Sequence, residues 1–227
     1  MASHRALGID LTLELVFTLR CGYDRRNTAN RKKSMTDWVY LHGFNSSPQS
    51  LKAQETKTWL ERHAPTIRFH CPQLAPHPAQ ALSQAHDLIS ALPQQTLIIG
   101  SSLGGFYASW CAERLNRKAI LVNPAVQPHQ ELQLLLGEQS NPYTGLRYTL
   151  SQEDVEVLAA HQTQHPDWRR YWLILGSADQ VLDWRVAARH FQGCRQTLFN
   201  GDDHRLQRWS ECLPHLVAFA QPSGAQG

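Results

Sequence analysis

Ile98-Ile99-Gly100-Ser101-Ser102-Leu103-Gly104-Gly105 is the stretch that decides the fold of this chain. An apolar run leads into it and a helical pattern follows it, so the stretch joins a strand to a helix. In that setting the pattern G-x-S-x-G predicts a nucleophile elbow, a turn too tight for bulky residues two places before or after the serine. Ser102 is therefore the candidate nucleophile, and a plain glycine-rich turn is the alternative.

From Met35 onward, short apolar runs alternate with helical patterns. We expect helices between six strands, which lie at residues 38–41, 66–70, 96–99, 119–122, 172–175 and 196–199, and a last helix at 206–220. Strands that alternate with helices form βαβ units, which build a mainly parallel sheet with helices on both faces. Residues 123–168 interrupt this alternation, are helical in part and contain four prolines. They are the insertion that could cover a site.

The first 34 residues differ from the remainder. They carry a net charge of +4, whereas the remainder carries −1. Residues 9–19 alternate between apolar and polar, which predicts a half-buried strand, and residues 24–34 read as a basic linker. We expect 1–34 to be a dispensable extension, either disordered or loosely attached as a strand. An edge strand added to the sheet is the alternative. Residues 35–222 then form one domain, and 223–227 a flexible tail.

Composition excludes several classes of protein. The body of the chain lacks the basic balance of a nucleic-acid-binding protein. No apolar run approaches the roughly 20 residues needed to span a bilayer. The five cysteines are scattered without C-x-x-C spacing, which favours reduced thiols and a cytoplasmic location. A monomer and a homodimer are both compatible with the sequence.

Reactive side chains follow four of the expected strands, in loops at 42–44, 100–105, 176–179 and 201–204. Ligands of a parallel sheet bind beyond the carboxyl ends of its strands, so these loops should open onto one edge. The chain order Ser102, Asp179, His204 is that of α/β-hydrolases. We therefore expect a three-layer α/β-hydrolase fold of about six strands, with a small lid or none.

Each member of this set has a chemical task. His204 would take the proton of the Ser102 hydroxyl and later return it to the leaving group. Asp179 would hold the imidazole in the correct tautomer and stabilise the imidazolium. Asp183 competes for this role, although it could instead cap the helix that begins at Trp184.

Two further groups of residues complete the expected site. The backbone N–H groups of Phe44 and Leu103 are the candidate donors to an oxyanion. Proximity to the loops makes several other side chains candidates for a substrate pocket: His42, Tyr107, Val126, Tyr143, Leu182 and Leu206, with Phe44 and Leu103 themselves. Core or loop packing is the alternative for each, and we expect His42 to shape its loop, with a catalytic role as the alternative.

These features predict hydrolysis of a small-molecule carboxylic ester or thioester through an acyl-enzyme on Ser102, without a metal or other cofactor. A catalytically idle binding or scaffold protein with the same fold is one alternative. An acyltransferase that uses the same three residues is another.

Several motifs resemble those of the YqiA-type esterases, a family of small bacterial α/β-hydrolases. They are Leu41-His42-Gly43-Phe44-Asn45-Ser46-Ser47-Pro48, Gly100-Ser101-Ser102-Leu103-Gly104-Gly105, Asn123-Pro124-Ala125-Val126, Asn141-Pro142-Tyr143-Thr144-Gly145 and the segment from Asp179 to Asp183. The resemblance covers about residues 36–220. It implies an esterase or thioesterase, with acyl-CoA among its possible substrates and with Ser102, Asp179 and His204 as the triad.

Overall fold

A computed structural model describes residues 36–221 of the chain. The expected extension 1–34 and the expected tail 223–227 both lie outside the described residues, so these two assignments stay predictions.

Six parallel strands form the central sheet. In chain order they are β1 (Thr36–Leu41), β2 (Ile67–His70), β3 (Leu97–Ser101), β4 (Ala119–Val122), β7 (Tyr171–Gly176) and β8 (Arg195–Phe199). Their order across the sheet is β2-β1-β3-β4-β7-β8, and every neighbouring pair is parallel. Strands β1, β3, β4 and β7 are almost wholly buried, as strands covered on both faces must be.

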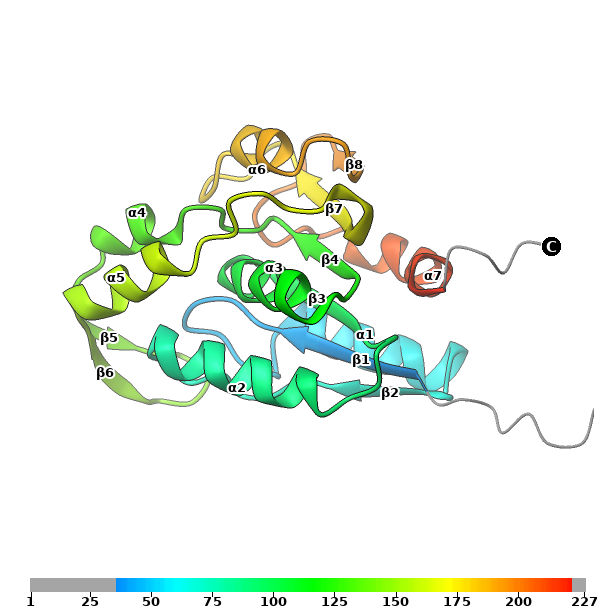
Figure 1. Ribbon diagram of the computed structural model, residues 1–227, viewed down its shortest axis with the longest axis horizontal. Helices are drawn as coiled ribbons and strands as arrows, with labels where there is room; N and C mark the ends of the chain where they lie inside the picture. The colour runs from blue at the N-terminus through cyan, green and yellow to red at the C-terminus, as the bar shows by residue number, and fades with distance from the viewer. Residues whose placement is uncertain (1–35, 222–227) are drawn as a thin grey trace, which may run out of the picture. The chain divides into compact units, whose positions relative to one another are not determined.

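Helices cover both faces of this sheet, and each face has its own hydrophobic core (Figure 1). On one face lie α2 (Pro78–Ser90), α3 (Leu103–Leu115) and α6 (Trp184–His190). On the other face lie α1 (Leu51–His63) and α7 (Trp209–Ala220), packed around Trp38, Trp172 and Trp209. This is the predicted three-layer α/β architecture. Helix α7 begins three residues later than expected, because Leu206 has a φ of 51°, which a helix does not accommodate.

The insertion between β4 and β7 is more regular than its prolines indicated. It contains α4 (Pro128–Gln133), an antiparallel pair of strands, β5 (Gly137–Ser140) and β6 (Arg147–Leu150), and then α5 (Gln152–Ala160). The hairpin escaped prediction because its strands are only four residues long and their side chains are mostly polar. Ser151 and Asp154 form a capping box that starts α5. A short 3₁₀ helix, η1 (Trp168–Arg170), leads into β7.

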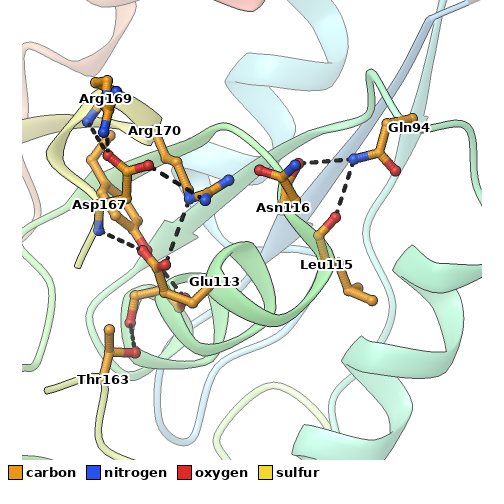
Figure 2. Close-up of polar contacts among 10 residues, drawn as sticks. Gln94, Glu113, Leu115, Asn116, Thr163, Asp167, Arg169 and Arg170 are labelled. Atoms are coloured by element: carbon orange, nitrogen blue, oxygen red, sulfur yellow. Dashed lines mark hydrogen bonds and ion pairs between the residues drawn. The ribbon is translucent and has the colours of Figure 1, made fainter. Parts of the chain in front are cut away.

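Helix α3, which follows the elbow, is held at its far end by polar contacts (Figure 2). The Glu113 carboxylate accepts hydrogen bonds from the Asp167 N–H at 2.9 Å and the Tyr171 hydroxyl at 2.5 Å. The Gln94 amide donates to the carbonyl oxygens of Leu115 and Asn116, at 3.2 and 2.9 Å. These contacts fix the position of α3 and, through it, of the serine at its N-terminus.

Candidate active site

The candidate site lies where the chain reverses its direction across the sheet. From β1 the chain moves outward to β2 and then returns to β3 on the other side of β1. At such a switch point the loops that follow two adjacent strands diverge and leave a crevice. The loop after β1 carries Gly43 and Phe44, and the turn after β3 carries Ser102. The strand order therefore places the candidate nucleophile at the expected edge.

Ser102 has the strained backbone of a nucleophile elbow. Its φ of 56° and ψ of −124° lie outside the regions that non-glycine residues favour. A Cβ at Gly100 would overlap the carbonyl oxygen of Gly104, and a Cβ at Gly104 would overlap that of Leu41. Gly105 permits a close approach of Pro124, whose Cβ would lie 2.6 Å from an added Cβ. The three glycines let α3 leave the strand at once, and this turns the serine out of the sheet.

Asp179 and His204 come together from the loops after β7 and β8. His204 Nδ1 lies 2.8 Å from Asp179 Oδ2, and the Asp179 side chain is only 1% exposed. The other carboxylate oxygen accepts the N–H groups of Val181 and Leu182, each at 2.8 Å. Asp179 is thus held on both sides. His204 Nδ1 carries the hydrogen that this contact requires, which leaves Nε2 as an acceptor.

Asp183, the competing carboxylate, has the other role that the sequence allowed. Its side chain caps α6 by accepting the Arg185 N–H at 3.0 Å. The helix-terminal amide and the Arg185 guanidinium lower the pKa of Asp183. The geometry therefore pairs Asp179, not Asp183, with His204.

Asn123, at the end of β4, connects the loops that carry Asp179 and His204. Its amide nitrogen donates to the carbonyl oxygens of Asp203 and His204, both at 3.1 Å, and its Oδ1 accepts the Gly176 N–H at 2.8 Å. Asn123 is buried and has a φ of 40°. Asn123 belongs to one of the family motifs but was not among the expected site residues. The feature of the sequence that could have predicted its role is an asparagine directly after a buried strand, because asparagine adopts positive φ more readily than most residues.

The two expected oxyanion donors lie in suitable loops. Within residues 36–221, neither the Phe44 N–H nor the Leu103 N–H donates a hydrogen bond. A Cβ built on Gly43, the residue before Phe44, would lie 3.6 Å from Ser102 Oγ, so the loop passes close to the hydroxyl. Leu103 is the first residue of α3, where backbone N–H groups have no partner within the helix.

His42 holds the loop after β1 in its conformation. Its Nε2 accepts the Leu74 N–H at 3.0 Å, and its Nδ1 donates to the Gly43 carbonyl oxygen at 3.0 Å. Burial lowers the pKa of His42, in agreement with a neutral ring that donates at one nitrogen and accepts at the other. Both ring nitrogens are therefore occupied by backbone groups.

Two cavities flank the loop of residues 43–46, which lines both. We call the first the serine cavity. It has a volume of about 420 Å³ and is lined by Ser102, His204 and mainly polar neighbours, which include Tyr40, Ser50, Lys52, Tyr143 and Arg205. The second, the apolar cavity, has a volume of about 440 Å³ and is lined by side chains that include His42, Phe44, Leu74, Leu103, Tyr107 and Leu146. Within residues 36–221, no hydrogen bond joins Ser102 Oγ to His204, although both residues line the serine cavity.

The cavities include some of the expected pocket residues and omit others. His42, Phe44, Leu103 and Tyr107 line the apolar cavity, and Tyr143 lines the serine cavity. Val126, Leu182 and Leu206 line neither. Val126 and Leu206 are buried in the two hydrophobic cores, and the Leu182 N–H is bound to Asp179. Chain proximity to the loops placed these three near the site, but their side chains are not in the cavity walls.

Lys52 was not expected in the site. It lies in the first turn of α1, and its Nζ donates to the Arg205 carbonyl oxygen at 2.6 Å. Burial lowers the pKa of Lys52 to about 8, an effect that the nearby carboxylates of Asp203, Glu55 and Asp179 only partly oppose. Nothing in the local sequence showed that the start of α1 would face the serine, since only the packing of α1 beside the loop after β8 brings them together.

Comparison with solved structures defines the class of fold. A putative hydrolase from Agrobacterium vitis S4 superposes with a TM-score of 0.64 at 17% identity, covering 82% of this chain and 88% of that one. Est1E from Butyrivibrio proteoclasticus gives 0.65 at 12% identity, covering 82% and 87%. The fold is that of the α/β-hydrolases.

Sequence comparison then gives the family. Residues 37–221 match the Uncharacterised protein family UPF0227. A UPF0227 protein of Serratia proteamaculans (strain 568) is 24% identical over 183 residues, which cover 78% of this chain and 93% of the relative. The chain belongs to UPF0227, the family of the YqiA-type esterase-like proteins, which confirms the resemblance seen in the motifs. Among the described residues, no helix has the length and apolar character needed to cross a membrane.

Proposed function

We propose that this protein is a serine hydrolase that cleaves small acyl esters or thioesters through an acyl-enzyme on Ser102. One observation carries the proposal: the 2.8 Å contact between His204 and Asp179 at the cavity that also holds the elbow serine. The class of fold, the family and the hydrolases and esterases among the structural neighbours support it.

The proposed reaction uses these groups in sequence. His204 Nε2 accepts the hydroxyl proton while Ser102 Oγ attacks the acyl carbon, and Asp179 stabilises the resulting imidazolium. The Phe44 and Leu103 N–H groups stabilise the tetrahedral oxyanion. The C–O or C–S bond then breaks, and the leaving group takes the proton from His204. Water, deprotonated by His204, finally cleaves the acyl-enzyme and restores the Ser102 hydroxyl.

Replacement of Ser102 by alanine tests this proposal. We expect Ser102→Ala to lose at least about 10³-fold in kcat on p-nitrophenyl butanoate, since the nucleophile is absent. The wild type should react with a fluorophosphonate probe at Ser102, and the variant should not. Retention of most activity by the variant would show that another group is the nucleophile. A wild type that neither turns over esters nor reacts with the probe would favour the idle scaffold.

Product analysis distinguishes hydrolysis from acyl transfer, the other chemistry open to the same residues. We expect the free acid as the main product in water. If turnover instead required an added alcohol and gave its ester, the protein would be an acyltransferase. A series of p-nitrophenyl esters and acyl-CoA thioesters of increasing chain length would define the acyl group.

A further inference from the structure

Several hydrogen-bond donors that have no acidic partner within residues 36–221 line the serine cavity but not the apolar cavity. Lys52 and Arg205 both line the serine cavity. Within residues 36–221 no carboxylate lies within 4.0 Å of either cation, and the one hydrogen bond of the Lys52 ammonium goes to the Arg205 carbonyl oxygen. An ammonium group has three N–H donors, so two remain for a ligand.

The start of α1 adds to these donors. Ser50 precedes the helix and lines the same cavity, and its Oγ is shielded from solvent and has no hydrogen-bond partner among the described residues. The first turn of α1 holds no acidic residue. No acidic side chain in the first turn therefore neutralises the unpaired backbone N–H groups at the start of α1 or the positive end of its dipole.

Two of the three carboxylates whose charges act on Lys52 are bound to other groups. Asp203 accepts the Arg205 N–H at 2.9 Å and the Gln207 amide at 3.1 Å, and Asp179 is bound to His204 and two backbone N–H groups. Glu55 lies one turn along α1, and burial raises its pKa. None of these carboxylates contacts the ammonium directly.

We propose that Lys52, Ser50 and Arg205 form an anion subsite at the start of α1, which binds a carboxylate or phosphate on the leaving group of the substrate. The subsite belongs to the leaving group because His204, which must protonate that group, lines this cavity together with Lys52. Of the two oxyanion donors, Leu103 lines the apolar cavity and Phe44 lines both cavities, so the apolar cavity adjoins the oxyanion donors and is left for the acyl chain. This inference rests on the proposed esterase function.

Two chromogenic esters with the same acyl group test the subsite. They are the butanoates of 4-nitrophenol, which is neutral as an ester, and of 5-hydroxy-2-nitrobenzoate, which carries a carboxylate. A charged hydrogen bond contributes enough to change kcat/KM by about 10- to 100-fold. We expect Lys52→Met to lose at least about ten times more kcat/KM on the anionic ester than on the neutral one, and Lys52→Arg to restore much of the difference.

Lys57→Met is the matched control. Lys57 lies on the same helix, its side chain is 55% exposed, and it pairs with Glu61. This variant should keep the charge preference of the wild type. An equal loss on both esters in Lys52→Met would overturn the proposal, because Lys52 would then act only by positioning the loop of His204. No loss on either ester would overturn it as well.

A binding measurement separates the subsite from the proposed reaction. The Ser102→Ala variant is titrated calorimetrically with phenol, 4-hydroxybenzoate and 4-hydroxyphenyl phosphate, with and without Lys52→Met. Tighter binding of an anionic phenol that depends on Lys52 supports the subsite even if the wild type hydrolyses no ester, and the preferred anion identifies the group. Ester hydrolysis without any charge preference in binding or turnover would leave the proposed function intact and refute the subsite.

Discussion

Ser102 combines chemical reactivity with backbone strain. A non-glycine residue in a sparsely populated region of φ and ψ costs about 1–3 kcal/mol, and the surrounding structure must hold it there. Here the Ser102 N–H is bound to the Val122 carbonyl oxygen at 3.0 Å, and the Ser102 carbonyl accepts the N–H groups of Gly105 and Ala125. The elbow thus maintains a conformation that an isolated serine would avoid.

The strained backbone at position 102 predicts that a residue tolerant of positive φ would make the protein more stable, although it would lack the catalytic hydroxyl. Ser102→Gly should be more stable than Ser102→Ala by about 1 kcal/mol, because glycine tolerates positive φ although it gives up more entropy on folding. Urea unfolding of the two variants measures the difference. Alanine keeps the strain and also lacks the hydroxyl, so it is the proper reference. Equal stability of the two variants would show that the elbow is not strained.

Lys52 predicts a pH dependence of anion binding. Its pKa of about 8 reflects desolvation, opposed by Asp203, Glu55 and Asp179 and reinforced by Arg205. Below pH 8 the ammonium is protonated and attracts an anion, and above pH 8 it progressively loses its charge. A bound anion favours the charged form, so the decline in affinity should begin somewhat above pH 8.

Calorimetric titration of Ser102→Ala with 4-hydroxybenzoate between pH 6.5 and 9.5 checks this expectation. The Kd should rise with pH in the Lys52 protein and should depend much less on pH in the Lys52→Met background. His204 also lines the cavity, and the comparison between backgrounds removes its contribution. The same pH slope in both backgrounds would contradict the assignment to Lys52.

At the scale of elements, the site depends on loops that follow different strands. Helix α3 fixes the serine, whereas Asp179 and His204 lie on the loops after β7 and β8. Asn123 links these two loops through three hydrogen bonds. A buried polar network of this kind is costly to break, because each partner left unpaired loses its hydrogen bond without regaining water.

Loss of the Asn123 side chain should therefore reduce turnover more than substrate binding. We expect Asn123→Ala to lower kcat by about 10- to 100-fold with a small change in KM, since a shift of about 1 Å in a catalytic group has effects of this size. Unfolding free energy should fall by about 2–4 kcal/mol, as buried partners lose their bonds. Steady-state kinetics and urea unfolding measure the two effects.

Asn116→Ala is the matched control for Asn123→Ala. Asn116 also has positive φ, 53°, but it ends α3 on the side away from the serine. Its replacement should cost stability through the same backbone strain and leave kcat near that of the wild type. A comparable loss of kcat in both variants would indicate a general effect of destabilisation and would rule out a positioning role for Asn123.

At the scale of the whole molecule, periodicity predicted the sheet and its two helical layers. Trp38–Leu41 and Ala119–Val122 were recognisable because buried parallel strands are continuous apolar runs. Ser102 was predicted as the nucleophile from its glycines, and Asp179 and His204 as its partners from their order after later strands. Contacts between distant segments were not predictable: Lys52 meets Arg205 across 153 residues, and Asn123 meets His204 across 81. No local pattern encodes such pairs.

Every element and cavity described above lies in residues 36–221, and the family match covers 37–221. We therefore expect deletion of residues 2–34 to leave kcat/KM within about twofold and Tm nearly unchanged, because the family match and every residue of the candidate site lie outside this segment. Esterase assays and calorimetry of the shortened protein test this. A large loss of turnover or of Tm would assign residues 1–34 a part in the fold, as the alternative of an added edge strand requires.

The loop of residues 43–46 forms a wall common to both cavities, and this constrains how the protein can diverge. A substitution in the loop alters the surroundings of both ends of the substrate together, so selection for a new acyl chain there would also disturb the leaving group. Independent adjustment is possible only at the outer walls. Leu146 and Tyr148 of the β5–β6 hairpin line only the apolar cavity and can be changed for one end, and the start of α1 can be changed for the other. Engineering of new selectivity should begin at these outer walls and spare the shared loop.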